Sequence, residues 1–228
     1  MVTIVDSLQA VQATIVAATV TANRTDKVNL LAVSKSQTSD KLRAAYLAGQ
    51  TLFGENYVQE AISKQAELND LAIEWHFIGP IQGNKTALIA QHFDWVHSVD
   101  RLKIAQRLNE ARPDNLPPLN VCIQINSSNE DSKSGVDIGF QSMLAKEIAA
   151  MPKLKLRGVM AIPALAQDFA KQRTQFKIVA DAYKSLQAQA FDLDTLSIGM
   201  SDDYVAAIQE GATMVRIGSA IFGARALK

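Results

Sequence analysis

Residues 28–35 read Val-Asn-Leu-Leu-Ala-Val-Ser-Lys, and five of these eight residues are apolar. A short apolar run of this kind is typical of a buried β-strand. The run ends on Lys35, and an ammonium group buried without a partner is costly. A lysine in this position therefore reaches solvent, pairs with a carboxylate, or serves as a desolvated amine for carbonyl chemistry. The residues downstream bear on the choice among these three alternatives.

Seven more segments of strand character follow along the chain, and segments of helical character separate them. After the 28–35 segment, we expect strands within residues 51–54, 74–78, 95–99, 119–126, 154–162, 195–199 and 214–217. We expect helices within residues 2–21, 38–47, 55–68, 84–92, 101–112, 136–151, 168–190 and 202–210. Regular alternation of this kind is typical of parallel strands joined by helices.

Eight strands alternating with helices predict an α/β protein built as a single (β/α)8 TIM barrel. A doubly wound sheet is the alternative, because alternation alone does not separate the two folds. The length of 228 residues suits one domain of either kind, and no repeat or interdomain linker divides the chain. We therefore expect one domain over residues 1–228.

The charge balance limits the kinds of partner. Lys plus Arg and Asp plus Glu each number 23, and the pI is about 6.8. A neutral chain argues against binding to nucleic acid or to an acidic membrane surface. The three histidines, His76, His92 and His97, do not show the spacing of metal ligands, so we expect no metal site.

The N-terminal segment and the cysteine content indicate the compartment. Asp6, Gln9 and Gln12 interrupt the first twenty residues, and no basic region precedes them. This pattern predicts an amphipathic helix rather than a signal peptide or a membrane span. The single cysteine, Cys122, excludes an intramolecular disulfide and fits a reducing, cytoplasmic compartment. No long apolar helix face is evident, so we expect a monomer.

Chemically useful residues follow several of the predicted strands, and in a barrel the active site lies at the carboxyl ends of the strands. Lys35 ends the first strand, Ser201 follows the seventh, and Arg216, Gly218 and Ser219 end the eighth. Phosphate sites in barrels often form after the last two strands, where glycine lets backbone amides approach an anion. The alternative is that these glycines and serines only form tight turns.

An amine and a phosphate site at one mouth suggest pyridoxal 5'-phosphate (PLP), whose aldehyde forms a Schiff base with lysine. Arg216 is placed to face the pyridine nitrogen or, as the alternative, to pair with a carboxylate. An arginine keeps its proton, so it would leave that nitrogen unprotonated and weaken the electron sink. Transamination would then be disfavoured, whereas racemisation and plain cofactor binding would remain open.

Three weaker signals lie near the same mouth. Asn56 follows the second strand and is placed to reach into the mouth. Met160 lies in the sixth strand, where it either belongs to the core or packs on the cofactor ring. The polar loop 127–135 is either solvated or in contact with a ligand.

Six segments in chain order resemble the motifs of one known family: Ala32-Val33-Ser34-Lys35, Phe53-Gly54-Glu55-Asn56-Tyr57-Val58-Gln59-Glu60, His76-Phe77-Ile78-Gly79-Pro80-Ile81-Gln82-Gly83-Asn84-Lys85, Ser132-Lys133-Ser134-Gly135, Gly199-Met200-Ser201-Asp202 and Val215-Arg216-Ile217-Gly218-Ser219-Ala220-Ile221-Phe222-Gly223. The family is that of the YggS-like pyridoxal phosphate homeostasis proteins, also called the proline synthetase co-transcribed (PROSC) family. The resemblance covers nearly the whole chain, and six motifs in register are far more specific than any one of them.

The resemblance implies a single barrel similar to the N-terminal domain of alanine racemase, with PLP held as a Schiff base at Lys35. It implies a role for each of the other candidate residues: phosphate binding by Ser201, Gly218 and Ser219, contact with the pyridine nitrogen by Arg216, and a place near the ring for Asn56 and Met160. Ser219 stands where threonine is usual and keeps the hydroxyl group. Ile81 and Gly83 stand where leucine and serine are common, and neither bears on cofactor binding.

The family is known for cofactor homeostasis and for no firmly established reaction, so the resemblance implies a PLP carrier or buffer rather than an enzyme. Apo-enzymes that need PLP are the partners that a carrier implies. The alternative is an amino-acid racemase, which needs an acid or base on each face of the cofactor. Alanine racemase takes its second base, a tyrosine, from a further domain that we do not expect here. Tyr57 and Tyr204 have no evident claim to that role.

Overall fold

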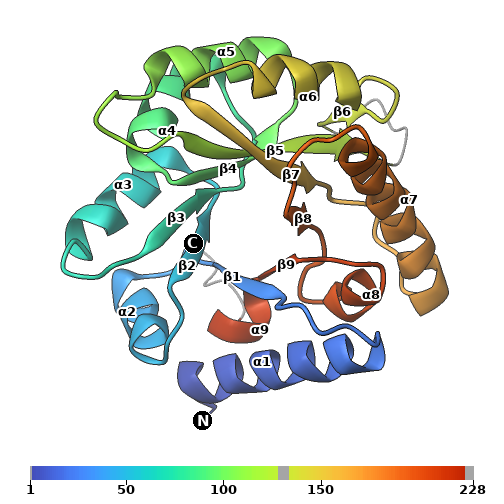
Figure 1. The fold of residues 1–228 in the computed structure, drawn as a ribbon. Helices are drawn as coiled ribbons and strands as arrows, with labels where there is room; N and C mark the ends of the chain where they lie inside the picture. The colour runs from blue at the N-terminus through green and yellow to red at the C-terminus, as the bar shows by residue number, and fades with distance from the viewer. Residues whose placement is uncertain (1, 128–133, 224–228) are drawn as a thin grey trace.

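The computed structural model describes residues 2–127 and 134–223, and its central feature is a closed barrel of parallel strands (Figure 1). The barrel strands are β1 (Asn29–Val33), β2 (Leu52–Glu55), β3 (Glu74–Phe77), β4 (Trp95–Val99), β5 (Leu119–Asn126), β7 (Leu154–Met160), β8 (Thr195–Ser197) and β9 (Met214–Ile217). Each strand pairs with the next, and β9 pairs with β1. The predicted α/β barrel is thereby confirmed, and the doubly wound alternative is wrong because the sheet closes.

The helices form the outer layer around the barrel (Figure 1). They are α1 (Ile4–Thr21), α2 (Ser39–Leu47), α3 (Val58–Glu67), α4 (Thr86–His92), α5 (Leu102–Ala111), α6 (Gln141–Ala149), α7 (Phe169–Ala188), α8 (Tyr204–Gln209) and α9 (Ser219–Phe222). A helix follows each barrel strand, and α1 packs beside α2, α8 and α9. Together, α1 and α9 cover the side of the barrel where β9 meets β1.

The first helix fits the amphipathic prediction. It begins with a capping box, in which the Thr3 side chain accepts from the Asp6 N–H and the Asp6 carboxylate accepts from the Thr3 N–H. One face is buried against the other helices, through Leu8, Val11, Ile15 and Ala18. By length and composition alone, this 18-residue helix of mean hydropathy 1.3 is apolar enough to cross a membrane. Its packing places it instead in the helical layer of the barrel.

Side chains along each strand alternate between the barrel interior and the layer of helices. Phe77 and Val96 belong to the large apolar core, which lies between strands and helices. Trp95, Cys122 and Met160 form a separate small apolar cluster, and the alternation places it inside the barrel. The interior also contains fully buried polar side chains, which are described below.

Three local features differ from the sequence predictions. The helix expected from residue 55 begins at Val58, because Glu55 is the last residue of β2 and its carboxylate is buried. A two-residue strand, β6 (Val136–Asp137), pairs with the end of β5, and a 3₁₀ turn, η1 (Gly83–Lys85), precedes α4.

Part of the prediction lies outside the described residues. The polar loop predicted at 127–135 includes residues 128–133, and the motif at 132–135 loses its first two residues for the same reason. The single domain over residues 1–228 stays a prediction.

Candidate functional site

A cavity of about 270 Å³ opens at the carboxyl ends of β1, β2 and β9, which is the end of a barrel where active sites lie. Six of the seven residues singled out from the sequence line it: Lys35, Asn56, Ser201, Arg216, Gly218 and Ser219. Seven further residues line the cavity: Val33, Gln37, Ile78, Ile162, Met200, Asp202 and Gly223. The fold therefore brings together groups that are up to 184 positions apart in the sequence (Lys35 to Ser219).

The backbone on both sides of Lys35 is held by named contacts. The Ser34 N–H donates to the Gly54 carbonyl at 2.9 Å, which continues the pairing of β1 with β2. Ser36 adopts a left-handed conformation, with φ of 60°, and its N–H donates to Oε1 of Glu60 at 2.6 Å. The chain therefore turns sharply directly after Lys35.

A buried cluster on β2 and α3 supports this turn, and we call Ser34, Glu55, Glu60 and Lys64 the Lys64 cluster. The Lys64 ammonium donates to the Ser34 carbonyl at 2.7 Å, to Glu55 Oε1 at 2.7 Å and to Glu60 Oε1 at 2.6 Å. The Ser34 hydroxyl donates to the same Glu55 oxygen at 2.6 Å. All three donors of Lys64 are used, so this lysine acts as a structural tie between α3 and the end of β1.

Burial and pairing oppose each other at Glu55, and burial has the larger effect. Burial raises the pKa of the Glu55 carboxyl, while the nearby Lys64 ammonium lowers it. Among the described residues, Oε2 of Glu55 has no hydrogen-bond partner. The cluster therefore depends on Lys64 to keep a buried carboxyl group paired.

Two hydroxyl groups meet at one end of the cavity. Ser219 Oγ donates to Ser201 Oγ at 3.1 Å, so the loops that follow β8 and β9 are in contact. Gly199 makes the first of these loops possible, because it adopts φ of 91° and a Cβ there would lie 2.6 Å from Ala207 Cβ. The paired hydroxyls and the backbone beside Gly218 form a polar end suited to an anion.

Arg216 provides a buried cation in the same cavity. Its Nη1 donates to the Ser197 carbonyl and, at 3.0 Å, to the Ser197 hydroxyl, while Nη2 donates to the Ala161 carbonyl at 2.9 Å. Burial lowers the pKa of the Arg216 guanidinium to about 10, although Asp203 opposes this change. Arg216 is therefore charged at neutral pH. It uses three of its five N–H donors on these contacts.

Asn56 is placed at the cavity by a close approach of two loops. A Cβ on Gly79 would lie 2.4 Å from the Asn56 carbonyl, so only glycine fits there. The Ser98 hydroxyl donates to the Gly79 carbonyl at 2.6 Å and fixes this loop to β4. Among the described residues, Oδ1 of Asn56 is buried without a hydrogen-bond partner. A buried acceptor of this kind is open to a ligand.

Met160 differs from the other six candidates. It is 1% exposed and packs with Trp95 and Cys122 in the barrel interior, and it is not among the cavity residues. Ile162, two residues after the end of β7, lines the cavity instead. The ring contact of Met160 remains a prediction, and the lining favours Ile162 for that place.

Sequence reasoning missed the support around the cavity. Gln37, Ile78 and Asp202 lie within two residues of a strand end or motif, so their position was a usable signal. Lys64 carried no such signal, because its contacts come from the packing of α3 against β1 and β2.

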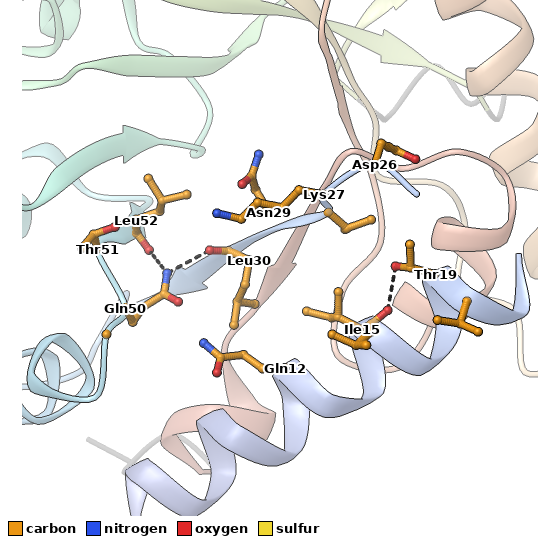
Figure 2. A pocket seen from close by; sticks show the side chains of 14 residues that line it. Gln12, Ile15, Thr19, Asp26, Lys27, Asn29, Leu30, Gln50, Thr51 and Leu52 are labelled. Carbon is orange, nitrogen blue, oxygen red and sulfur yellow. Dashed lines mark hydrogen bonds between the residues drawn. The ribbon is translucent and has the colours of Figure 1, made fainter. Parts of the chain in front are cut away.

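A second cavity, of about 470 Å³, lies at the opposite end of the barrel, between α1 and the starts of β1 and β2 (Figure 2). Figure 2 shows the Gln50 amide donating to the carbonyls of Leu30 and Leu52, at 2.8 and 2.7 Å, and Thr19 donating to Ile15. These polar groups are satisfied by the protein itself. We assign the functional site to the smaller cavity, where an amine, hydroxyls and a guanidinium converge.

The converging groups define a ligand by its chemistry. Lys35 supplies an amine, which forms covalent bonds with aldehydes. The Ser201–Ser219 end suits an anion, and Arg216 donates hydrogen bonds to an acceptor such as a ring nitrogen. The site therefore suits an anionic carbonyl compound that also carries a hydrogen-bond acceptor.

Comparison with known proteins agrees with the fold and names a family. The model of the family described as "Alanine racemase, N-terminal domain" matches residues 7–226. The structure of an alanine racemase from Corynebacterium glutamicum superposes with a TM-score of 0.70 at 19% identity, over 95% of this chain and 62% of that chain. At that identity the similarity shows the fold alone.

More similar proteins share most of the chain. A pyridoxal phosphate homeostasis protein of Vibrio alginolyticus is 55% identical over 204 residues, which cover 88% of each chain. The structure of PipY from Synechococcus elongatus with PLP bound has a TM-score of 0.84 at 35% identity, over 96% of this chain and 100% of that chain. The chain described here belongs to the family of pyridoxal phosphate homeostasis proteins, which share the fold of the N-terminal domain of alanine racemase.

Proposed function

We propose that this protein binds PLP reversibly and serves as a carrier or buffer of that cofactor. The observation that carries the proposal is the convergence of Lys35, the Ser201–Ser219 hydroxyl pair and Arg216 on one cavity. PLP carries an aldehyde, a phosphate and a pyridine nitrogen, and each of these groups has a counterpart among the three. The homeostasis proteins at more than 50% identity and PLP-bound PipY support the same ligand.

The cavity fits the cofactor in size and in its donor set. Its volume of about 270 Å³ lies close to the lower end of small-molecule sites, which run from roughly 300 to 1,000 Å³. The unpartnered Asn56 oxygen marks a polar position that a ligand group can satisfy. In this arrangement Lys35 would bond to the aldehyde, and Ser201, Gly218 and Ser219 would hold the phosphate. Arg216 would donate to the pyridine nitrogen, and Asn56 would lie near the ring.

The residues that line the cavity favour binding of PLP over catalysis with it. When bound, PLP supplies an electron sink, and a protonated pyridine nitrogen would strengthen it. Arg216 would donate to that nitrogen and, with a pKa of about 10, would keep its own proton at neutral pH, so the sink would stay weak. Racemisation also needs a proton donor on the second ring face. Tyr57 is 59% exposed and lines a neighbouring cavity of about 260 Å³ rather than this one.

The wider role follows from the proposal. A PLP carrier meets the apo-enzymes that need PLP, and these are the partners we propose, without nucleic acid or membrane. A cytoplasmic location and a monomeric state belong to the same proposal, and the buried thiol of Cys122 fits a reducing compartment.

Titration with PLP tests the proposed function directly. The ligand-free protein is titrated with PLP and followed by near-ultraviolet and visible absorbance, for the natural chain and for Lys35→Ala. The natural chain should develop the band of a lysine-bound PLP, and Lys35→Ala should not, although its phosphate contacts leave residual binding. Lys85→Ala is the matched control, because Lys85 lines the neighbouring cavity instead.

Two results would count against the proposal. Failure of the natural chain to take up PLP would reject PLP as the ligand. Steady loss of optical rotation from an L-amino acid, dependent on Lys35, would replace the carrier with a racemase.

A further inference from the structure

A column of polar side chains crosses the interior of the barrel below the cavity. Ser197 Oγ lies 2.9 Å from His97 Nδ1, and His97 Nε2 lies 2.9 Å from His76 Nδ1. His76 Nε2 lies 2.8 Å from Oε1 of Glu74, at the start of β3. At the other end, Arg216 donates to the Ser197 hydroxyl. The column, defined as Glu74, His76, His97 and Ser197, therefore joins Arg216 to the opposite end of the barrel.

The hydrogen bonds in the column can be ordered in one direction. A carboxylate only accepts, so His76 Nε2 carries the proton and donates to Glu74. His76 Nδ1 is then an acceptor, and His97 donates to it from Nε2. His97 Nδ1 in turn accepts from the Ser197 hydroxyl, which accepts from Arg216. Every donor therefore points away from the guanidinium and toward the carboxylate, with a full charge at each end.

The two imidazoles are neutral in this arrangement. His76 and His97 are fully buried, and burial lowers the pKa of each, with Glu74 opposing the change at His76. His76 and Arg216 lower the pKa of His97 further. The hydrogen bond from His76 lowers the pKa of Glu74, so the carboxylate stays ionised. With both imidazoles neutral, each ring has one donor and one acceptor nitrogen, as the direction of the hydrogen bonds in the column requires.

Packing alone does not account for a polar column in this position. Apolar side chains would fill the interior without the cost of burying two imidazoles and a hydroxyl. The column is instead fixed in orientation, because His76 stacks on Trp95 with ring centroids 5.2 Å apart and planes 12° apart. The Arg157 guanidinium lies over the same indole at 4.5 Å. These polar groups are buried despite that cost, and they contact the site residue Arg216 through Ser197. This combination indicates a positioning role.

We propose that Glu74, His76, His97 and Ser197 are positioning residues that orient the Arg216 guanidinium toward the ligand through a one-way column of hydrogen bonds. The proposal rests on the proposed function only in naming PLP as the ligand. In the proposed function Arg216 would meet the pyridine nitrogen, and its Nη1 donates to the Ser197 hydroxyl at the end of the column. Because a single tautomer of both histidines satisfies the column, the guanidinium has one preferred orientation instead of several.

The tautomers are tested in the ligand-free protein by nitrogen-15 NMR of the histidine side chains. His76 and His97 should both be neutral and protonated on Nε2. Glu74→Gln should change the signals of His97, which does not contact Glu74 and is joined to it only through His76. It should also change the signals of the Arg216 guanidinium. Glu110→Gln on the exposed face of α5 is the matched control and should leave both sets unchanged.

PLP binding then tests the link to the site. Glu74→Gln and Ser197→Ala should each weaken PLP binding about 10-fold, the effect of one hydrogen bond to a charged group. The absorbance of bound PLP should shift, because the pyridine nitrogen meets a less ordered donor. Thermal unfolding of the ligand-free variants separates this effect from lost stability, since a purely structural role would lower the melting temperature and leave the absorbance of bound PLP unchanged.

The outcomes judge the two proposals separately. A charged or Nδ1-protonated His76 or His97 in the natural chain would overturn the column, whatever the variants do. The column would also be overturned if Glu74→Gln showed the same Arg216 signals and the same PLP affinity as Glu110→Gln. If the natural chain fails to bind PLP, the proposed function is rejected, and the NMR result still decides whether the column exists.

Discussion

At the scale of single residues, the position of Lys35 is set by its two neighbours in the chain. Ser34 continues the β1–β2 pairing, and Ser36 reverses the chain in a left-handed conformation. Lys35 thereby lies at the mouth of the barrel on a backbone that is held on both sides. The other end of the cavity is defined just as locally, by the contact of Ser201 with Ser219. Selectivity for the phosphate should depend on these two hydroxyls.

Ser219→Ala should weaken PLP binding about 10-fold, because it removes one hydrogen bond to a charged phosphate. Binding of pyridoxal, which lacks the phosphate, should be unchanged. The measurement is the ratio of the two dissociation constants, and Ser219→Thr should restore it by restoring the hydroxyl. Equal losses for both ligands would show that Ser219 acts on the shape of the cavity and not on the phosphate.

Cysteine reactivity is also set at this scale. Cys122 is fully buried, and burial raises the pKa of its thiol. The thiolate is the reactive form, so labelling in the native protein should be slow and should become fast in denaturant. Fast native labelling, followed by mass spectrometry, would show that the interior of the barrel opens.

At the scale of elements, the Lys64 cluster ties α3 to the ends of β1 and β2. Its ion pair with Glu55 is buried, with side-chain exposures of 6% for Lys64 and 0% for Glu55. A buried pair contributes little relative to apolar residues, but loss of one partner leaves an unpaired charge. The cluster is therefore a point at which a single change in a helix should disturb the site residue Lys35.

Lys64→Met should lower the free energy of unfolding by about 3–5 kcal/mol, because it strands the Glu55 carboxyl. The double variant Glu55→Leu with Lys64→Met should lose less than the single variant. Lys103→Met, at an exposed position of α5, is the control and should stay within about 0.5 kcal/mol of the natural chain. Urea unfolding measures all three, and a Lys64→Met variant as stable as the control would contradict the account.

The strands were predictable from sequence because each is a compact run of strand-forming residues between turn residues. The start of α3 was not, since the burial of Glu55 in β2 depends on Lys64 from another element. The two-residue β6 carries no pattern of its own. The sequence placed Met160 in a strand but does not give its depth in the barrel, and only the packing shows that Met160 is buried while Ile162 lines the cavity.

At the scale of the whole molecule, the barrel interior joins the two ends of the protein. The functional site opens at one end, and Glu74 lies half exposed at the other. His76 and His97 lie between them and are neutral because burial lowers the pKa of each. This arrangement links the stability of the fold to pH.

Stability should fall as the pH drops below about 6.5, because the unfolded chain binds protons at histidines that stay neutral when folded. The expected slope is about 1.4 kcal/mol per pH unit for each histidine. At pH values closer to the ordinary range of a glutamate carboxyl, Glu55 opposes this trend, since burial raises the pKa of its carboxyl in the folded state.

His97→Gln should reduce the slope by about 1.4 kcal/mol per pH unit relative to the natural chain, because burial lowers the pKa of His97. Urea unfolding at several pH values measures the slope. A slope equal to that of the natural chain would show that His97 titrates alike in the folded and unfolded chains.

The central claim is that Lys35 anchors PLP in this cavity. Borohydride reduction of the PLP-loaded protein, followed by peptide mapping with mass spectrometry, tests it most directly. The account predicts a single pyridoxyl group, located on Lys35. A pyridoxyl group on another lysine, or none at all after PLP has bound, would contradict the assignment of this site.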